Sequence, residues 1–256
     1  MPIFEINLPK SLSKALGIPP RSPRSAQLRV LKKLLKRAQY TAFGQKNKFD
    51  EILTSRHIGK RFQEVVPSYN YNKIYQEWWH LTLEGQTDIC WPGKINYFAL
   101  SSGTSEAASK YIPVTNDLLR GNKIIMIKQL ISLFKYRDVP LSALGRGWLT
   151  LGGSTDLQKG AGYYAGDLSG ITAKKAPFWF QPFYKPGKKI AKERDWNKKL
   201  KEIVEKAPEW DISFIIGVPA WIQMCLEMVI ERYQLKNIHE IWPNLTFFVH
   251  GGVSFE

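Results

Sequence analysis

The hydrophobic positions follow a helical period in some stretches of the chain and form short β-branched or aromatic runs in others. Ser25 is the expected N-cap of the first helical stretch, because its hydroxyl can accept from unpaired backbone N–H groups. Phe43-Gly44 are expected to close that helix, and Val65-Val66-Pro67 to be extended, because the residue before proline avoids helical angles. The predicted helices are Ser25–Tyr40, Phe49–Arg56, Asn72–Leu83, Thr115 to about Tyr136, and the latter half of 185–206.

The β-type runs predict strands at 95–99, at 147–153 with a glycine turn at its end, at 212–217 and at 245–250. Pro219 starts a helix between the last two strands, and a strand–helix–strand unit implies a parallel pair with a right-handed connection. The stretch Gly160–Gly170 holds four glycines and predicts a long loop. Together these elements predict an α/β fold with mostly parallel sheets flanked by helices.

A run of small hydroxyl residues follows the strand at 95–99 and precedes the helix that begins at Thr115. Small side chains let backbone N–H groups approach an anion, and glycine permits backbone angles that other residues avoid. Lys110 adds a mobile positive charge. This segment therefore suggests a phosphate site, although the Walker spacing is absent and a hydroxyl-rich turn often satisfies only its own backbone. Its residues are Ser101, Ser102, Gly103, Thr104 and Ser105.

A second small-residue segment, Gly251-Gly252-Val253, follows the strand at 245–250. Ligands of open α/β sheets collect beyond the carboxyl ends of parallel strands. We therefore expect this segment and the hydroxyl segment to face the same crevice at the rim of a parallel sheet. The alternative for a glycine pair after a strand is a tight turn.

Several of these residues resemble the auxin-responsive promoter (Gretchen Hagen) family of acyl acid amido synthetases, in the adenylate-forming superfamily. The hydroxyl segment with Lys110 and Pro113 is similar to that family's phosphate-binding signature. The resemblance extends over roughly residues 26 to 256, and Ala107 departs from it where the family usually has glycine. Its further matches are Thr41-Ala42-Phe43-Gly44, Glu84–Ile89, Trp91-Pro92-Gly93 and Ile241-Trp242-Pro243-Asn244.

The resemblance implies the fold of the large domain of adenylate-forming enzymes, with ATP and Mg²⁺ as cofactors and a carboxylic acid and an amine or amino acid as partners. The hydroxyl segment and Lys110 would hold the β- and γ-phosphates, and Gly251, Gly252 and Val253 would contact the nucleotide. The resemblance also makes the next helix a candidate wall of the acyl pocket, through Met126, Gln129 and Leu130.

Residues 1–25 contain several prolines and little periodicity, which predicts an extended arm or loops. The resemblance implies that 26–256 form part of an amino-terminal domain, without the family's carboxy-terminal domain. We therefore expect little ligase turnover from this chain and at most weak nucleotide binding.

The charge balance is strongly basic, with 37 Lys and Arg against 22 Asp and Glu. A charge of +15 favours anions such as nucleotides, nucleic acid or acidic lipid headgroups, but it is also compatible with a solvated surface. The helix at 25–40 carries its basic residues on one face, and such a face is also explained by simple exposure to solvent without a ligand. The basic residues are Arg29, Lys32, Lys33 and Lys36.

The two cysteines and four histidines show no metal-ligand spacing, so no metal site is predicted, and Cys225 is expected to be buried. We also expect no signal peptide, no membrane partner and a cytoplasmic location. Two other classes stay open: a nucleic-acid-binding protein, which fits the charge but lacks a known motif, and a non-catalytic scaffold of the same fold.

Overall fold

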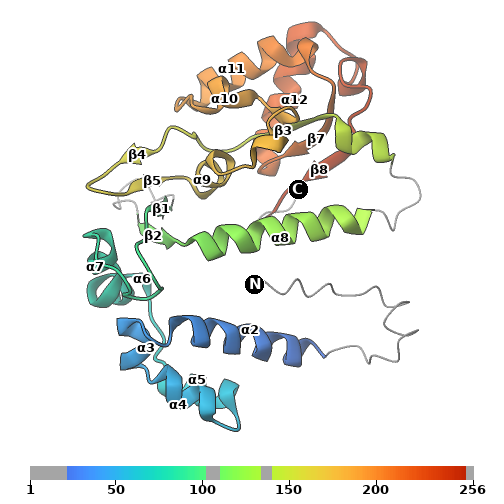
Figure 1. Cartoon of the computed structure of the whole chain (residues 1–256). Coiled ribbons are helices and arrows are strands. Elements are labelled where there is room, and N and C mark those ends of the chain that lie inside the picture. Colours follow the sequence, from blue (N-terminus) through green and yellow to red (C-terminus); the bar gives the residue numbers. More distant parts are fainter. Residues whose placement is uncertain (1–21, 102–109, 134–139, 252–256) are drawn as a thin grey trace. The chain divides into compact units, whose positions relative to one another are not determined.

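A computed structural model of the chain describes residues 22–101, 110–133 and 140–251 (Figure 1). The contacts divide the chain into two compact units, Met1–Lys94 and Ile95–Glu256. Each unit is described by itself. None of the helices within the described ranges combines the length and apolar character that crossing a bilayer requires.

The first unit is helical. Its elements are α2 (Pro23–Ala38), α3 (Ala42–Lys46), α4 (Phe49–Thr54), α5 (Ile58–Val65), α6 (Tyr71–Ile74), the π-helical turn η1 (Tyr75–Trp79) and α7 (His80–Leu83). The predicted helix over 72–83 is confirmed as the continuous stretch α6–η1–α7, and Trp78 within it is buried.

The expected cap of the first helix is wrong by one turn. Ser22 is the N-cap of α2, and its hydroxyl accepts a hydrogen bond of 3.2 Å from the backbone N–H of Ser25. Pro23 occupies the first helical position, where the missing N–H costs nothing and the fixed φ suits a helix. Ser25 lies inside the first turn instead.

Thr41 separates α2 from α3, so the prediction that Phe43-Gly44 close the first helix is wrong. The Thr41 hydroxyl donates to the Ala38 carbonyl at 2.7 Å and accepts from the Gly44 N–H at 3.1 Å, which ends one helix and caps the next. Val65 is the last residue of α5 rather than extended, and only Val66 adopts the extended angles expected before Pro67.

The second unit is α/β. Its elements are β1 (Tyr97–Leu100), β2 (Tyr111–Val114), α8 (Asn116–Leu133), η2 (Leu141–Gly145), β3 (Gly147–Thr150), β4 (Gln158–Lys159), β5 (Tyr164–Gly166), α9 (Leu168–Lys174), η3 (Phe178–Phe180), β6 (Tyr184–Lys185), α10 (Gly187–Ala191), α11 (Trp196–Lys206), η4 (Ala207–Glu209), β7 (Ile212–Ile216), α12 (Pro219–Tyr233), η5 (Ile238–Glu240) and β8 (Phe247–Val249).

One sheet has the order β6-β3-β7-β8 and is parallel throughout. The predicted strand–helix–strand unit is confirmed: β7 and β8 pair in parallel with Phe214 opposite Phe247, and Pro219 opens α12 between them. The second sheet, β2-β1-β5-β4, is mixed, because only β1 and β5 are parallel. The predicted α/β class is confirmed.

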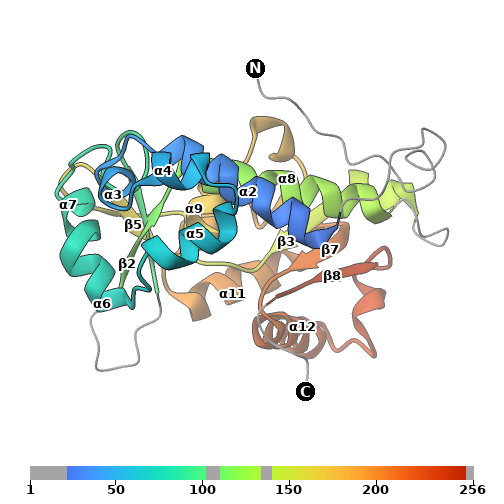
Figure 2. The ribbon, with the colours of Figure 1, turned by 90° about the horizontal axis from the view of Figure 1, so that it is seen from below.

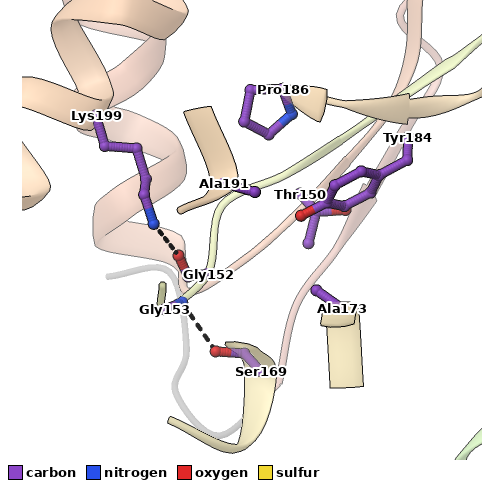
Figure 3. A pocket seen from close by; sticks show the side chains of 9 residues that line it. All are labelled: Thr150, Gly152, Gly153, Ser169, Ala173, Tyr184, Pro186, Ala191 and Lys199. Atoms are coloured by element: carbon purple, nitrogen blue, oxygen red, sulfur yellow. Dashed lines mark hydrogen bonds between the residues drawn. The ribbon is translucent and has the colours of Figure 1, made fainter. Parts of the chain in front are cut away.

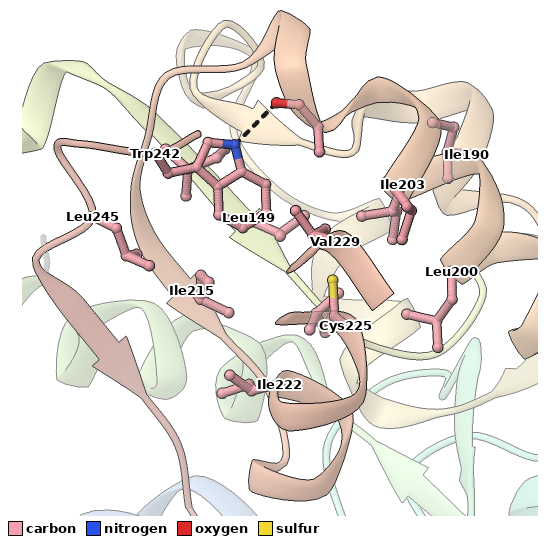
Figure 4. Packing of buried hydrophobic residues seen from close by; sticks show 14 residues of the cluster. Leu149, Ile190, Leu200, Ile203, Ile215, Ile222, Cys225, Val229, Trp242 and Leu245 are labelled. Atoms are coloured by element: carbon pink, nitrogen blue, oxygen red, sulfur yellow. Dashed lines mark hydrogen bonds between the residues drawn. The ribbon is translucent and has the colours of Figure 1, made fainter. Parts of the chain in front are cut away.

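The parallel sheet is covered on both faces (Figures 1 and 2). Leu149 and Ile215 point to one side, where α11 and α12 close over them in one hydrophobic core cluster (Figure 4). Trp148 and Phe214 point to the other side, where their rings stack 4.3 Å apart and Leu130 of α8 packs against them. Burial on both faces explains the nearly continuous apolar run at 212–216.

The mixed sheet overturns two predictions. The hydroxyl segment does not join a strand to a helix, because residues 111–114 form the strand β2, which pairs antiparallel with β1. Pro113 is tolerated there since β2 is an edge strand. The predicted long loop over Gly160–Gly170 is also wrong, because it contains β5 and the start of α9.

Trp242 ties the last connection to the parallel-sheet core, and its replacement provides a test of the fold. It is fully buried, and its indole Nε1 donates to the Ala207 carbonyl at 3.0 Å (Figure 4). We expect Trp242→Phe to lower the free energy of unfolding by about 1–3 kcal/mol, because the Ala207 carbonyl loses its partner. Urea denaturation measures this, with Trp179→Phe as the control, since Trp179 is 56% exposed. Equal effects of the two changes would contradict this account of the core.

Candidate functional site

The parallel sheet has a topological switch point between β3 and β7. The chain leaves β3 towards β6 on one side and leaves β7 towards β8 on the other. At the carboxyl end of β3 the chain continues through Leu151 into Gly152-Gly153, and at the end of β7 it continues into Gly217. Open α/β sheets bind ligands at such a point, which makes this edge the candidate site.

A small depression lies at the end of β3 (Figure 3). Its cavity volume of about 10 Å³ accommodates roughly one water molecule. The depression is therefore too small to hold a nucleotide, and its lining residues instead pack beneath the edge of the sheet. It is lined by Thr150, Gly152, Gly153, Ser169, Ala173, Tyr184, Pro186, Ala191 and Lys199.

Lys199 brings a buried positive charge to this edge. Its side chain comes from α11, is 4% exposed, and donates from Nζ to the Gly152 carbonyl at 3.2 Å (Figure 3). Burial lowers the pKa of Lys199, while the nearby carboxylates of Asp167 and Glu193 oppose that shift. The lysine thus fixes the strand-end carbonyl and adds positive potential in a place of low dielectric.

The turn after β3 is held from two sides. The Gly153 N–H donates to the Ser169 hydroxyl of α9 at 2.9 Å, and the Ser154 hydroxyl donates to the Lys192 carbonyl at 2.7 Å. The start of α9 lies so close that a Cβ on Gly170 would sit 2.1 Å from the Ser154 carbonyl oxygen. This contact requires glycine in α9 and leaves the turn little freedom.

The hydroxyl segment begins at the end of β1, in the mixed sheet. Ser101 donates its backbone N–H to the Lys110 carbonyl at 3.1 Å, which extends the β1–β2 hairpin by one pair. Lys110 is exposed. Ser102, Gly103, Thr104 and Ser105, and also Ala107, lie outside the described residues, so their phosphate role stays a prediction.

Gly251 follows β8, the edge strand of the parallel sheet, and is exposed. The two predicted segments therefore belong to different sheets, not to the rim of one parallel sheet. The physical reason is that β1 takes β2 and β5 as neighbours rather than β3 or β8. Gly252 and Val253 lie outside the described residues. The nucleotide contact at 251–253 stays a prediction.

The proposed acyl-pocket residues share one helix but not one environment. Leu130 of α8 packs against the Trp148–Phe214 stack, Met126 is half-buried and Gln129 is exposed. Leu130 and Met126 can thus contact a ligand on the inner side of α8, whereas Gln129 lies on the outer side. Their role as substrate contacts stays a prediction.

The sequence analysis missed Lys199, Ser169 and Asp167. Lys199 stands in a lysine-rich stretch, and helical periodicity over 196–206 was the one signal that could have marked it as inward-facing. Ser169 was hidden inside the glycine-rich stretch that was interpreted as a loop.

Burial also shifts the pKa values of other described side chains. Cys225 is fully buried as expected, and burial raises its pKa to about 12, so its thiol stays protonated. Burial likewise raises the pKa of Tyr184 to about 12. In the described ranges, no group of three or more His, Cys, Asp and Glu side chains is placed to hold a metal ion.

A family model described as the GH3 family N-terminal domain matches residues 20–204, well over half of the chain. Two solved structures share the fold. The GH3.15 acyl acid amido synthetase has a TM-score of 0.63 and 18% identity, covering 91% of this chain and 41% of that chain. The AtGH3.15 acyl acid amido synthetase in complex with 2,4-DB has a TM-score of 0.52 and 17% identity, with 84% and 40% covered.

No curated protein matches the chain in sequence. The chain spans about two fifths of the length of the two synthetase structures that it matches.

Gly170→Ala tests whether the turn after β3 packs on α9. Although alanine favours helix formation, we expect this change to destabilise the protein by about 1–3 kcal/mol, because the new methyl group collides with the Ser154 carbonyl. Gly121→Ala in α8 is the matched control: its Cβ meets nothing within 4 Å, so it should stabilise by up to about 1 kcal/mol. Chemical denaturation measures whether each change lowers or raises the free energy of unfolding, and a Gly170→Ala variant more stable than the wild type would refute the contact.

Lys199→Met tests the buried charge through pH. Because the folded-state pKa of Lys199 lies below its ordinary 10.5, the unfolded chain binds more protons just below that pH. The stability of the wild type relative to this variant should therefore rise as pH approaches 10.5. Lys198→Met is the control with the opposite sign, because Glu193 raises the pKa of Lys198 and its contribution is lost at pH above 10.5. Unfolding free energies over this pH range measure both, and a flat difference for Lys199→Met would contradict its burial as a charge.

Proposed function

The chain belongs to the GH3 family, and on this premise we propose that it serves an acyl-adenylating, amide-forming reaction. Enzymes of this family use ATP. The substrates would be a carboxylic acid, MgATP and an amine or amino acid. The observation that carries the proposal is the family match, since it includes the β1–β2 hairpin with its hydroxyl segment and the turn after β3.

The reaction has two steps that balance without a further reactant. A carboxylate oxygen attacks the α-phosphorus of ATP, the bond from that phosphorus to the β-phosphate oxygen breaks, and pyrophosphate leaves. The amine nitrogen then attacks the acyl carbon of the acyl-adenylate, the bond from that carbon to the AMP oxygen breaks, and the amine releases a proton to solvent. Such chemistry depends mainly on positioning and on stabilising phosphate charge.

We assign the phosphate-binding part of this work to the β1–β2 hairpin. Ser101, Ser102, Gly103, Thr104 and Ser105 would supply hydroxyl and backbone N–H donors, and Lys110 a cation for the departing pyrophosphate. The exposed position of Lys110 opposite Ser101, where the hydroxyl segment leaves the strands, supports this role, because its amine can follow a moving phosphate. Magnesium would enter with the nucleotide.

The parallel sheet would support the nucleotide. Its edge at Gly152-Gly153 and Gly217 is the switch point at which such sheets bind ligands, and Lys199 stabilises the turn there. Gly251, Gly252 and Val253 would contact the base from the next strand. Met126 and Leu130 would contact the acyl group through the inner side of α8, whereas the exposed Gln129 on its outer side would contact it only if that side also faces the ligand. The small acyl acid 2,4-DB bound to AtGH3.15 supports a carboxylic acid as substrate class.

The test is ATP–pyrophosphate exchange by the protein as it occurs in the cell, over a panel of carboxylic acids. We expect exchange to depend on one class of acid, and Lys110→Met to lower the rate by roughly 10²-fold, as for loss of one charge-stabilising donor. Lys159→Met is the matched control, because Lys159 is exposed on β4 and has no assigned role. No exchange with any acid would refute the function, whereas exchange unaffected by Lys110→Met would refute only the assignment of the hairpin.

A further inference from the structure

The positive charge of the chain is concentrated near its amino terminus. No acidic residue occurs between Glu5 and Asp50, whereas this interval contains eleven basic residues. Six of these eleven lie in α2, which has no acidic residue of its own. The six are Arg24, Arg29, Lys32, Lys33, Lys36 and Arg37.

One side of α2 is already used for folding. Leu35 and Ala38 are buried in the core of the first unit, together with Phe49 and Ile52 of α4. The lysines of the helix lie on the remaining side and are exposed. No carboxylate of the described residues pairs with Lys32, Lys33 or Lys36. This side of the helix therefore carries uncompensated positive charge.

Two aliphatic side chains stand beside the lysines. Val30 is 57% exposed and Leu34 is 47% exposed. Val30 and Leu34 are four residues apart and form one row, which lies next to the row of Lys33 and Arg37. The exposed side of α2 thus presents a short aliphatic row between a basic row and the core-facing row of Leu31 and Leu35, along a helix about 24 Å long.

We infer that this side of α2 (Lys32, Lys33 and Lys36 with Val30 and Leu34) is a docking surface for an anionic phospholipid membrane. Lysines attract acidic headgroups, and aliphatic side chains next to them, as Val30 and Leu34 are next to Lys33, enter the boundary between headgroups and acyl chains. A nucleic acid would also attract the lysines, but its phosphates gain nothing from Val30 and Leu34. The aliphatic row therefore favours lipid.

This inference goes beyond the proposed function and does not depend on it. The expectation of no membrane partner rested on the lack of a spanning segment, and a peripheral contact needs none. Binding of this kind combines one electrostatic and one apolar signal, so it should be reversible and sensitive to salt.

The experiment is co-sedimentation of the protein with phosphatidylcholine vesicles, with and without phosphatidylserine. We expect binding only to the vesicles that contain phosphatidylserine, and weaker binding at high salt. The triple variant Lys32→Glu, Lys33→Glu, Lys36→Glu should lower the partition coefficient by about tenfold or more. The variant Val30→Ser, Leu34→Ser should lower it about fivefold, because it removes only the apolar contribution.

The matched control reverses three exposed lysines of the second unit, Lys188→Glu, Lys189→Glu and Lys192→Glu, which changes the net charge equally. Its vesicle binding should stay within about twofold of the wild type. Circular dichroism of every variant shows whether the helices persist. Equal losses in the control and the α2 triple variant would overturn the inference, since net charge alone would then explain binding. Binding to RNA or duplex DNA but not to vesicles, unaffected by Val30→Ser and Leu34→Ser, would also overturn it and favour a nucleic-acid partner.

Discussion

The register between β3 and β7 is the constraint on which the second unit depends. Both faces of this sheet are apolar, so a slip by one residue would still bury hydrophobic side chains, and the hydrophobic pattern alone fixes the register weakly. Ser213 supplies the missing specificity. It is fully buried at the irregularity between Ile212 and Phe214, and its hydroxyl donates to the Ala143 carbonyl at 2.6 Å. A register that separated this hydroxyl from the Ala143 carbonyl and left it buried without a partner would cost about 1–3 kcal/mol.

The register brings the strand ends to one edge, and α9 connects that edge to the mixed sheet. Ile171 of α9 is buried against Ala99 of β1, while Gly170, one residue earlier, lies against the Ser154 carbonyl after β3. A short helix with contacts on both sides thus sets the distance between the two sheets. The hairpin that carries the hydroxyl segment is positioned from the turn after β3 through this helix, although the two sheets share no strand.

The sequence predicted elements well where local pattern and tertiary environment agree. The run at 212–216 is apolar because both faces of β7 are buried, so this strand could be located. Proline is favoured at the first position of a helix, so Pro219 marked the start of α12 between β7 and β8. Prediction failed where a residue is present for a tertiary reason. The strand β2 was not predicted because it contains Pro113, and proline is unusual in strands. An edge position such as that of β2 tolerates proline. Gly170 was interpreted as part of a loop, because the contact that requires glycine at this position is with the Ser154 carbonyl, sixteen residues earlier in the chain, and local sequence does not reveal it. Lys199 is one of many lysines in its stretch, and only its burial under Gly152 distinguishes it.

The basic charge of the chain therefore acts in two physically different ways. Lys199 is surrounded by protein, so its field reaches the sheet edge with little screening, and nearby carboxylates keep its cost tolerable. The lysines of α2 face water, where the Debye length at physiological salt is about 8 Å and single charges have weak effects. Exposed lysines bind an anion appreciably only when several of them face an extended anionic surface. A single buried lysine, in contrast, produces a strong local potential by itself. A net charge of +15 consequently says little about function until each cation is assigned to one of these two environments.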